Sequence, residues 1–167
     1  SLVDNRPAVL RTVSTCRLLS RSPDPPAHDS RRPEVGLFGA RLFTWVQAAP
    51  AYRDLHAKAV DLLGSGDGRT WVDVGSGPGL VAELAAARGF TATALDTDPR
   101  MVRAASRRAN RGTHFDARLA DAADSTGSYD VVSAASLLCQ VEDPSAVLQT
   151  LWAGVRPGGA LLIVETT

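Results

Sequence analysis

The sequence contains few of the residues that build disulfide frameworks or metal centres. Only two cysteines, Cys16 and Cys139, occur among the 167 residues, and they lie far apart and outside any Cys-x-x-Cys motif. The three histidines are scattered and show no metal-ligand spacing. This pattern is typical of reduced thiols in a cytoplasmic protein, and it predicts no bound metal.

An excess of charge of one sign and a long apolar run are also lacking. Lysine and arginine together number 18, as do aspartate and glutamate, so the formal net charge is zero. A balanced chain has no electrostatic footprint for nucleic acid or for an anionic membrane. The apolar segment at residues 9–19 is interrupted by Arg11 and Arg17 and is too short for a bilayer span or a signal peptide. We therefore expect neither nucleic acid nor membrane as a partner.

The length and the 44% hydrophobic content suit one globular domain. Residues 1–34 mix Arg, Ser, Pro and Asp, and residues 20–33 in particular are a poor candidate for regular structure. We expect residues 1–34 to be a poorly ordered extension or linker, and residues 35–167 to be the core domain. A mitochondrial-type presequence is an alternative that Asp4 and Asp24 disfavour.

The most informative stretch is residues 71–79, WVDVGSGPG. Its apolar start suits a buried strand, and Asp73 places a carboxylate where open α/β sheets bind ligands. Gly75, Gly77 and Gly79 then remove Cβ atoms that would keep a ligand away from the backbone. An apolar helical pattern follows, so the stretch predicts a strand, a glycine turn and a helix that together hold a small molecule.

The glycine spacing narrows the choice of ligand. A dinucleotide-binding turn has glycines at its first, third and sixth positions, and counting from Gly75 the sixth position is Leu80. An NAD(P)-binding oxidoreductase is therefore a disfavoured alternative. A purely structural glycine turn is the other alternative.

A second acidic residue supports a nucleotide-like ligand. Residues 91–96 read as a strand that ends in Asp96, which stands 21 residues after Gly75. In nucleotide-binding α/β folds this spacing brings a carboxylate to the ribose hydroxyls. Asp98 and Pro99 have a sufficient explanation as the N-cap and first residue of the next helix.

The rest of the chain alternates helices and strands. Two helices are expected within residues 36–63, the second opening at Pro50, and later helices begin at Pro99 and after Asp143. Further strands are expected within 113–119, 129–133 and 160–165, the last after a turn at 156–159. Five apolar strands joined by right-handed crossovers predict a Rossmann-like, doubly wound, mostly parallel α/β sheet with strand order 3-2-1-4-5.

Four motifs in order resemble those of the class I S-adenosylmethionine (SAM) dependent methyltransferases. They are the acid and glycine turn at 73–79, DTDPRM at 96–101, LADAAD at 119–124 and RPGG at 156–159. The resemblance covers about residues 36–167, and its strength lies in the order and spacing of the motifs. It implies SAM as the cofactor and methyl transfer to a small-molecule acceptor. A non-catalytic member of the fold, acting as a binding or regulatory protein, is an alternative from another class.

The resemblance also implies which residues bind the cofactor. Asp73 and the glycine turn would lie against the methionine part, and Asp96 would bind the ribose. Asp121 with Ala122 would meet the adenine, with Asp124 as a rival for Asp121. The full expected set is Asp73, Gly75, Ser76, Gly77, Gly79, Asp96, Thr97, Met101, Asp121, Ala122 and Ser133.

The acceptor side is less defined. By resemblance, Phe38, Trp45 and Tyr52 would line the acceptor pocket, although each could instead pack in the core. Residues 138–140 read Leu-Cys-Gln where many relatives carry a Leu-His-His-type stretch. We therefore expect no histidine base from this loop and assign no catalytic residue.

The sequence stops at Thr167, just after the fifth expected strand. Class I methyltransferases usually continue with a helix and an antiparallel pair of strands, so the apolar fifth strand is expected to be an exposed edge. Three explanations would account for an exposed apolar edge strand. They are truncation before strands 6 and 7, a homodimer through this edge, and cover by residues 1–34. We rank cover by the Pro-rich, polar extension last.

Overall fold

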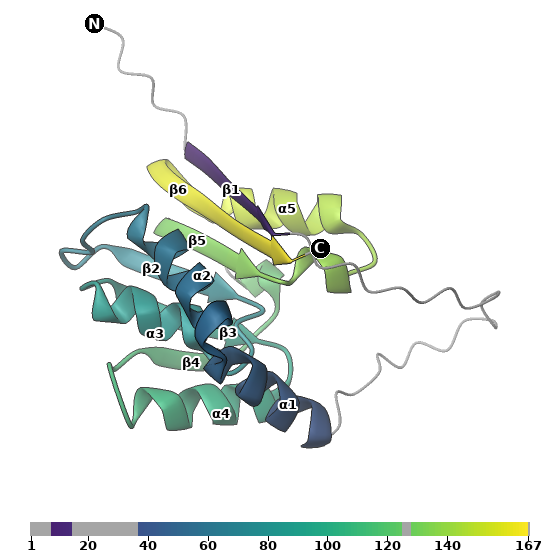
Figure 1. The fold of residues 1–167 in the computed structure, drawn as a ribbon. Helices are drawn as coiled ribbons and strands as arrows, with labels where there is room; N and C mark the ends of the chain where they lie inside the picture. Colours follow the sequence, from purple (N-terminus) through teal and green to yellow (C-terminus); the bar gives the residue numbers. More distant parts are fainter. Residues whose placement is uncertain (1–7, 15–36, 125–127, 167) are drawn as a thin grey trace, which may run out of the picture.

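The computed structural model describes residues 8–14, 37–124 and 128–166. These residues form one parallel sheet with helices on both faces (Figure 1). In chain order the elements are β1 (Ala8–Ser14), α1 (Leu37–Ala48), α2 (Pro50–Asp61), β2 (Thr70–Val74), α3 (Leu80–Ala87), β3 (Thr91–Asp96), α4 (Pro99–Ala109), β4 (Asp116–Leu119), η1 (Ala122–Asp124), β5 (Tyr129–Ala135), η2 (Leu138–Gln140), α5 (Pro144–Ala153) and β6 (Val155–Thr166).

The strand order of the sheet is β1-β6-β5-β2-β3-β4, and every neighbouring pair is parallel. The five strands expected from the sequence are β2 to β6, and among themselves they have the order 3-2-1-4-5. The predicted Rossmann-like, doubly wound α/β class is therefore confirmed. The order reverses between β2 and β5, which is where open sheets of this type bind ligands.

The edge beside β6 differs from the prediction. Residues 8–14 form β1, which pairs with β6 from Ala8 and Ala160 to Ser14 and Thr166. The expectation of an exposed fifth strand is therefore wrong, and so is the low rank given to cover by the N-terminal segment. The expectation of a poorly ordered extension fails for residues 8–14, while residues 1–7 and 15–34 lie outside the described part of the chain. Residues 8–14 form a strand because their backbone pairs with β6, and amino-acid composition alone does not predict this pairing.

The beginning of β6 also differs from the prediction. Val155 already pairs with Tyr129, and the next pairs start at Ala160 and Val131. Residues 156–159, expected as a turn before the strand, therefore interrupt the register inside β6. Gly158 takes a φ of +78°, which a glycine adopts without strain and which lets the chain bulge at this point.

Helix starts follow the sequence closely. Pro50 occupies the first turn of α2, and the Asp98 carboxylate accepts a hydrogen bond from the Arg100 N–H at the start of α4. Asp143 caps α5 in the same way, through the Ala146 N–H. A side-chain cap and a proline satisfy backbone groups locally, so these boundaries need no tertiary contact.

Two apolar cores lie on the two faces of the sheet. Trp71 packs with residues of α2, α3 and α4 on one face, whereas Val72 and Val74 pack with Leu151 of α5 on the other. On α5, Leu151 is buried, whereas Leu148 and Trp152 are exposed. Among the described residues, no helix has the length and apolar character needed to cross a membrane.

Candidate functional site

The glycine turn joins β2 to α3, and its three glycines take left-handed φ angles of +65° (Gly75), +53° (Gly77) and +83° (Gly79). A Cβ at Gly75 would lie 2.7 Å from a Leu137 methyl carbon, and one at Gly79 would lie 2.9 Å from the Phe115 ring. At Gly77 the nearest such atom is the Gln47 amide nitrogen, 3.6 Å away. Gly75 and Gly79 thus permit close packing inside the protein, and Gly77 alone leaves room for a ligand against the backbone.

Asp96, at the end of β3, lies directly against this turn. One of its carboxylate oxygens accepts the Gly77 N–H at 2.8 Å, and the other accepts the Asp98 N–H at 2.8 Å. Burial raises the pKa of Asp96, and these backbone hydrogen bonds oppose that effect because they favour the charged form. The acid and the glycine turn, predicted from two separate motifs, therefore form one site.

Asp73, near the end of β2, is fully buried. The Ser133 hydroxyl donates a hydrogen bond of 2.7 Å to its Oδ1, and the Trp71 indole N–H donates to the Ser133 hydroxyl at 2.8 Å. Burial raises the pKa of Asp73 to about 7, the Ser133 bond lowers it, and the nearby Asp96 carboxylate raises it further. Because the Ser133 hydroxyl is fully engaged inside the protein, its geometry suits positioning of Asp73 better than direct contact with a ligand.

The predicted adenine loop begins just after β4. The Asp121 N–H donates to Asp124 Oδ2 at 2.8 Å, and the Ala123 N–H donates to Asp121 Oδ1 at 3.3 Å. The two rival acids thus cap one short turn from opposite ends. The Ala120 N–H bonds to the Asp96 carbonyl at 3.0 Å, which places this loop beside Asp96. Its role toward adenine, shared with Ala122, stays a prediction.

The remaining predicted residues lie around the same edge of the sheet. Ser76 is buried, and its N–H donates to the Leu95 carbonyl at 2.9 Å, so the turn is tied to β3. Thr97 is exposed beside Asp96, and Met101 is buried in the first turns of α4. The structure therefore brings the predicted set together at the carboxyl ends of β2, β3, β4 and β5.

A second group of polar residues, mostly missed by the sequence reasoning, lies at the ends of β5 and β6. Burial raises the pKa of the Tyr52 hydroxyl, whereas a hydrogen bond with the Ser136 side chain lowers it. The negative charges of Asp73 and Glu165 raise it further. Ser136 has a φ of +54°, an uncommon conformation for a residue with a side chain. Such outliers persist where the surrounding contacts hold them, often at functional sites.

Glu165 is the most informative member of this group. Its Oε1 accepts the Leu138 N–H at 2.8 Å, while its Oε2 is buried and has no hydrogen-bond partner among the described residues. Partial burial and the Glu165 carboxylate raise the pKa of the Cys139 thiol, which argues against a reactive thiolate. A buried carboxylate oxygen without a partner is costly, so the position suits a ligand that donates a hydrogen bond.

Three aromatic residues were expected near the acceptor, and of the two whose side chains the structure describes, only Tyr52 lies at this site. Its ring stacks on His56 with centroids 4.2 Å apart. The Trp45 side chain is 73% exposed, which contradicts both a pocket wall and a core position. The Phe38 side chain lies outside the described part of the structure. No sequence motif identifies Ser136 or Glu165 as site residues, because they come together only when β5 pairs with β6. The one indication in the sequence was an acidic residue at the end of an apolar strand.

The chain is similar in sequence to known methyltransferases. The methyltransferase domain family matches residues 44–167. The ubiquinone biosynthesis O-methyltransferase of Xanthomonas axonopodis pv. citri is 30% identical over 141 residues, which cover 78% of this chain and 59% of the relative. The enzyme of the same name from Vibrio parahaemolyticus is 36% identical over 97 residues, covering 55% of this chain and 41% of the relative. The chain thus spans less than two thirds of the length of these relatives.

Solved structures show the same fold. A putative SAM-dependent methyltransferase from Methanococcus maripaludis has a TM-score of 0.68 at 18% identity, covering 82% of this chain and 67% of that one. The N-methyltransferase NodS from Bradyrhizobium japonicum, in complex with S-adenosylhomocysteine, has a TM-score of 0.61 at 22% identity, covering 71% and 64%. These matches agree with the predicted cofactor and do not favour the oxidoreductase alternative. Because the family match extends over most of the described chain and the strand order is the predicted one, the chain belongs to the methyltransferase domain family.

Proposed function

We propose that this chain carries the cofactor-binding core of a SAM-dependent methyltransferase whose acceptor is a small molecule with a hydroxyl group. The observation that carries the proposal is the 2.8 Å hydrogen bond from the Gly77 N–H to the Asp96 carboxylate. It joins the open face of the glycine turn to the acid at the end of β3. The choice of a hydroxyl acceptor is supported by the relatives named as O-methyltransferases.

The residues present fit the cofactor. A Cβ at Gly77 would have the Gln47 amide nitrogen, 3.6 Å away, as its nearest neighbour outside the turn, so a ligand has room there. The Asp96 carboxylate accepts backbone N–H groups of Gly77, Asp98 and Thr97, and a carboxylate has about four acceptor positions, so one is left for a ribose hydroxyl. When bound, SAM supplies a methyl group on a good leaving group. The protein then has mainly to align the acceptor and to exclude water.

The chain's own residues at β5 and β6 would act on the acceptor. We assign Glu165 Oε2 to the acceptor hydroxyl, because this buried oxygen lacks a donor among the described residues. The Tyr52 hydroxyl, bonded to Ser136, would help to orient the acceptor. The negative charge of Asp73, whose pKa burial raises to about 7, would in turn raise the pKa of the Tyr52 hydroxyl.

The test is the affinity for SAM, measured by calorimetry on the intact chain and on Asp96→Ala. We expect affinity to fall about ten- to a hundredfold, since charge-assisted hydrogen bonds to the ribose are lost. Asp143→Ala is the matched control, because it removes an N-cap of α5 and should leave the affinity unchanged. Equal SAM affinity for the intact chain and for folded Asp96→Ala would contradict the proposal.

Transfer of labelled methyl from SAM to a panel of hydroxylated small molecules separates an enzyme from a non-catalytic binding protein. An active enzyme should label at least one member of the panel. A protein that binds SAM but labels nothing in a broad panel would support the regulatory alternative.

A cytoplasmic location remains part of this proposal, supported by cysteines without disulfide-type spacing in the sequence. A homodimer through the β6 edge stays a prediction. It would require β1 to leave that edge, because β1 already pairs with β6.

A further inference from the structure

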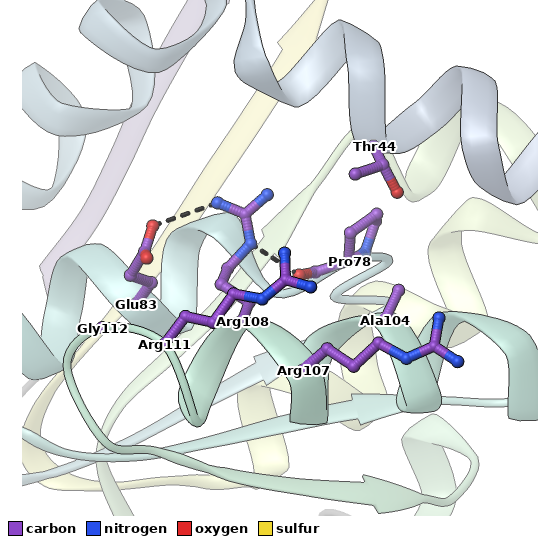
Figure 2. Close-up of a pocket in the computed structure, with 8 residues that line it drawn as sticks. All are labelled: Thr44, Pro78, Glu83, Ala104, Arg107, Arg108, Arg111 and Gly112. Carbon is purple, nitrogen blue, oxygen red and sulfur yellow. Dashed lines mark hydrogen bonds and ion pairs between the residues drawn. The ribbon is translucent and has the colours of Figure 1, made fainter.

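A cavity of about 500 Å³ lies between α1, the glycine turn, α3 and α4. Figure 2 shows the residues that line it. Its volume falls within the range of small-molecule sites. Among the described residues, three arginines and one acid supply its charged groups, and those that line it are Thr44, Pro78, Glu83, Ala104, Arg107, Arg108, Arg111 and Gly112.

The Arg108 guanidinium group is already bonded to other residues of the protein. Its Nε donates to the Pro78 carbonyl at 2.9 Å, one terminal nitrogen pairs with Glu83 at 3.0 Å, and the other reaches the Gln47 side-chain oxygen at 3.4 Å. The same Glu83 oxygen also accepts Arg53 at 3.0 Å. Glu83, the one acid among the described lining residues, is therefore shared by two arginines, and its charge is fully compensated.

Arg107 and Arg111 are different. Arg107 lies in the last turn of α4, and Arg111 follows two residues after the helix ends at Ala109. Figure 2 shows both side chains extending along the cavity side of α4. Within the described residues, neither guanidinium forms an ion pair with an acid. Both guanidinium groups are exposed, so an anion can reach them without competition from a paired acid.

We propose that this cavity binds the phosphate group of a small molecule between the guanidinium groups of Arg107 and Arg111. The planar fork of an arginine matches the oxygen pairs of phosphate, so two arginines can hold one phosphate through several charge-assisted hydrogen bonds. Ala104 and Pro78 add apolar surface for the organic part of a phosphate ester. The cavity adjoins the glycine turn through Pro78, but none of the residues assigned to the cofactor lines it, and the proposal does not depend on methyl transfer.

The test is calorimetric titration of the full chain with inorganic phosphate and with phenyl phosphate, at constant ionic strength set by sodium chloride. We expect saturable binding of one equivalent, weakened at least tenfold in both Arg107→Gln and Arg111→Gln. Arg103→Gln is the matched control, because Arg103 is exposed on the same helix but does not line the cavity. Its affinity should change less than twofold. Tighter binding of phenyl phosphate would identify an ester as the ligand, and equal or tighter binding of inorganic phosphate would identify the free ion.

Three results would overturn the proposal. One is the lack of saturable binding of either probe above the chloride background. Another is an equal loss in all three variants, which would indicate general attraction to a basic helix. The third is tighter binding of a ten-nucleotide single-stranded RNA than of both probes, which would assign the arginines to a nucleic-acid backbone. The substituted side chains of Arg103, Arg107 and Arg111 are not buried, so the variants should fold, and circular dichroism checks this.

Discussion

A single buried carboxyl group connects the proposed site to the stability of the protein. Asp73 is 1% exposed, and within the described residues its side chain accepts a hydrogen bond from the Ser133 hydroxyl alone. Burial favours the neutral acid, which is why the pKa rises from an ordinary value of 3.8 to about 7. Folding therefore takes up a proton at this residue between those two pH values.

The raised pKa of Asp73 predicts how stability depends on pH. Stability from this group is complete below about pH 4 and is lost as the pH rises through about 7, because the folded state then has to bury a charge. Asp73→Asn cannot become charged, so the variant should lack this component. We expect the intact chain to lose about 2–3 kcal/mol relative to Asp73→Asn between pH 5 and pH 8.

Urea unfolding of both proteins at the two pH values measures this difference. Parallel pH profiles for the intact chain and Asp73→Asn would show that Asp73 is not the titrating group. Using the difference between the two proteins removes the contributions of other acids and of His56.

At the residue scale, the sequence predicted the cofactor side of the site better than the acceptor side. Gly77 and Asp96 belong to motifs whose spacing follows from how a strand, a turn and a helix connect, so local reasoning found them. Tyr52 and Glu165 lie near each other because α2 packs against β6. Such contacts depend on tertiary packing, which neither periodicity nor spacing encodes.

Among the elements, β2, β5 and β6 are linked by side-chain interactions at their amino-terminal ends, opposite the site. Asp130 of β5 accepts hydrogen bonds from the Thr70 N–H at 2.8 Å and the Thr70 hydroxyl at 2.9 Å, and it pairs with Arg156 of β6. Burial of Asp130 tends to raise its pKa, but these hydrogen bonds and the arginine hold the pKa below its ordinary value. One side chain thus connects three neighbouring strands.

Asp130→Ala should therefore destabilise the sheet. We expect a loss of about 2–3 kcal/mol in the free energy of unfolding, because the variant leaves the partly buried Thr70 N–H and hydroxyl without their acceptor. Asp116→Ala is a matched control, since Asp116 pairs with Arg118 on the exposed edge strand β4. That change should stay within about 0.5 kcal/mol. Equal losses in urea unfolding of the two variants would contradict the role given to Asp130.

Elements with local signals were predicted well, and those without were not. The starts of α2, α4 and α5 carry proline or aspartate at capping positions, and all three were found. The strand β1 contains Arg11 in a segment of mixed composition, so its strand character follows from pairing with β6. The sequence of residues 156–159 predicted a turn before the strand, although β6 already begins at Val155. The pairing with β5 sets where β6 begins, and this pairing cannot be read from residues 156–159 alone.

For the molecule as a whole, β1 determines what happens at the β6 edge. A chain that begins at residue 15 would lack β1 and would expose a row of backbone N–H and C=O groups along residues 160–166. Exposed edges of this kind pair with other chains. We expect this shortened protein to have a larger mass in solution than the full chain at the same concentration, as measured by light scattering.

A chain that begins at Ala8 is the control, because it keeps β1 and should match the full chain. If the proteins beginning at residues 8 and 15 have the same mass at every concentration, β1 is not needed to protect the edge.

The pairing of β1 with β6 also has a consequence for biosynthesis. Residues 8–14 leave the ribosome before every other described strand, and their partner residues 160–166 follow after all of them. Parallel pairing between such distant segments is slow, because a long chain has to close before any contact forms. The nascent chain therefore carries residues 8–14 unpaired while the inner strands are synthesised. During that interval their exposed backbone and apolar side chains are a binding site for chaperones.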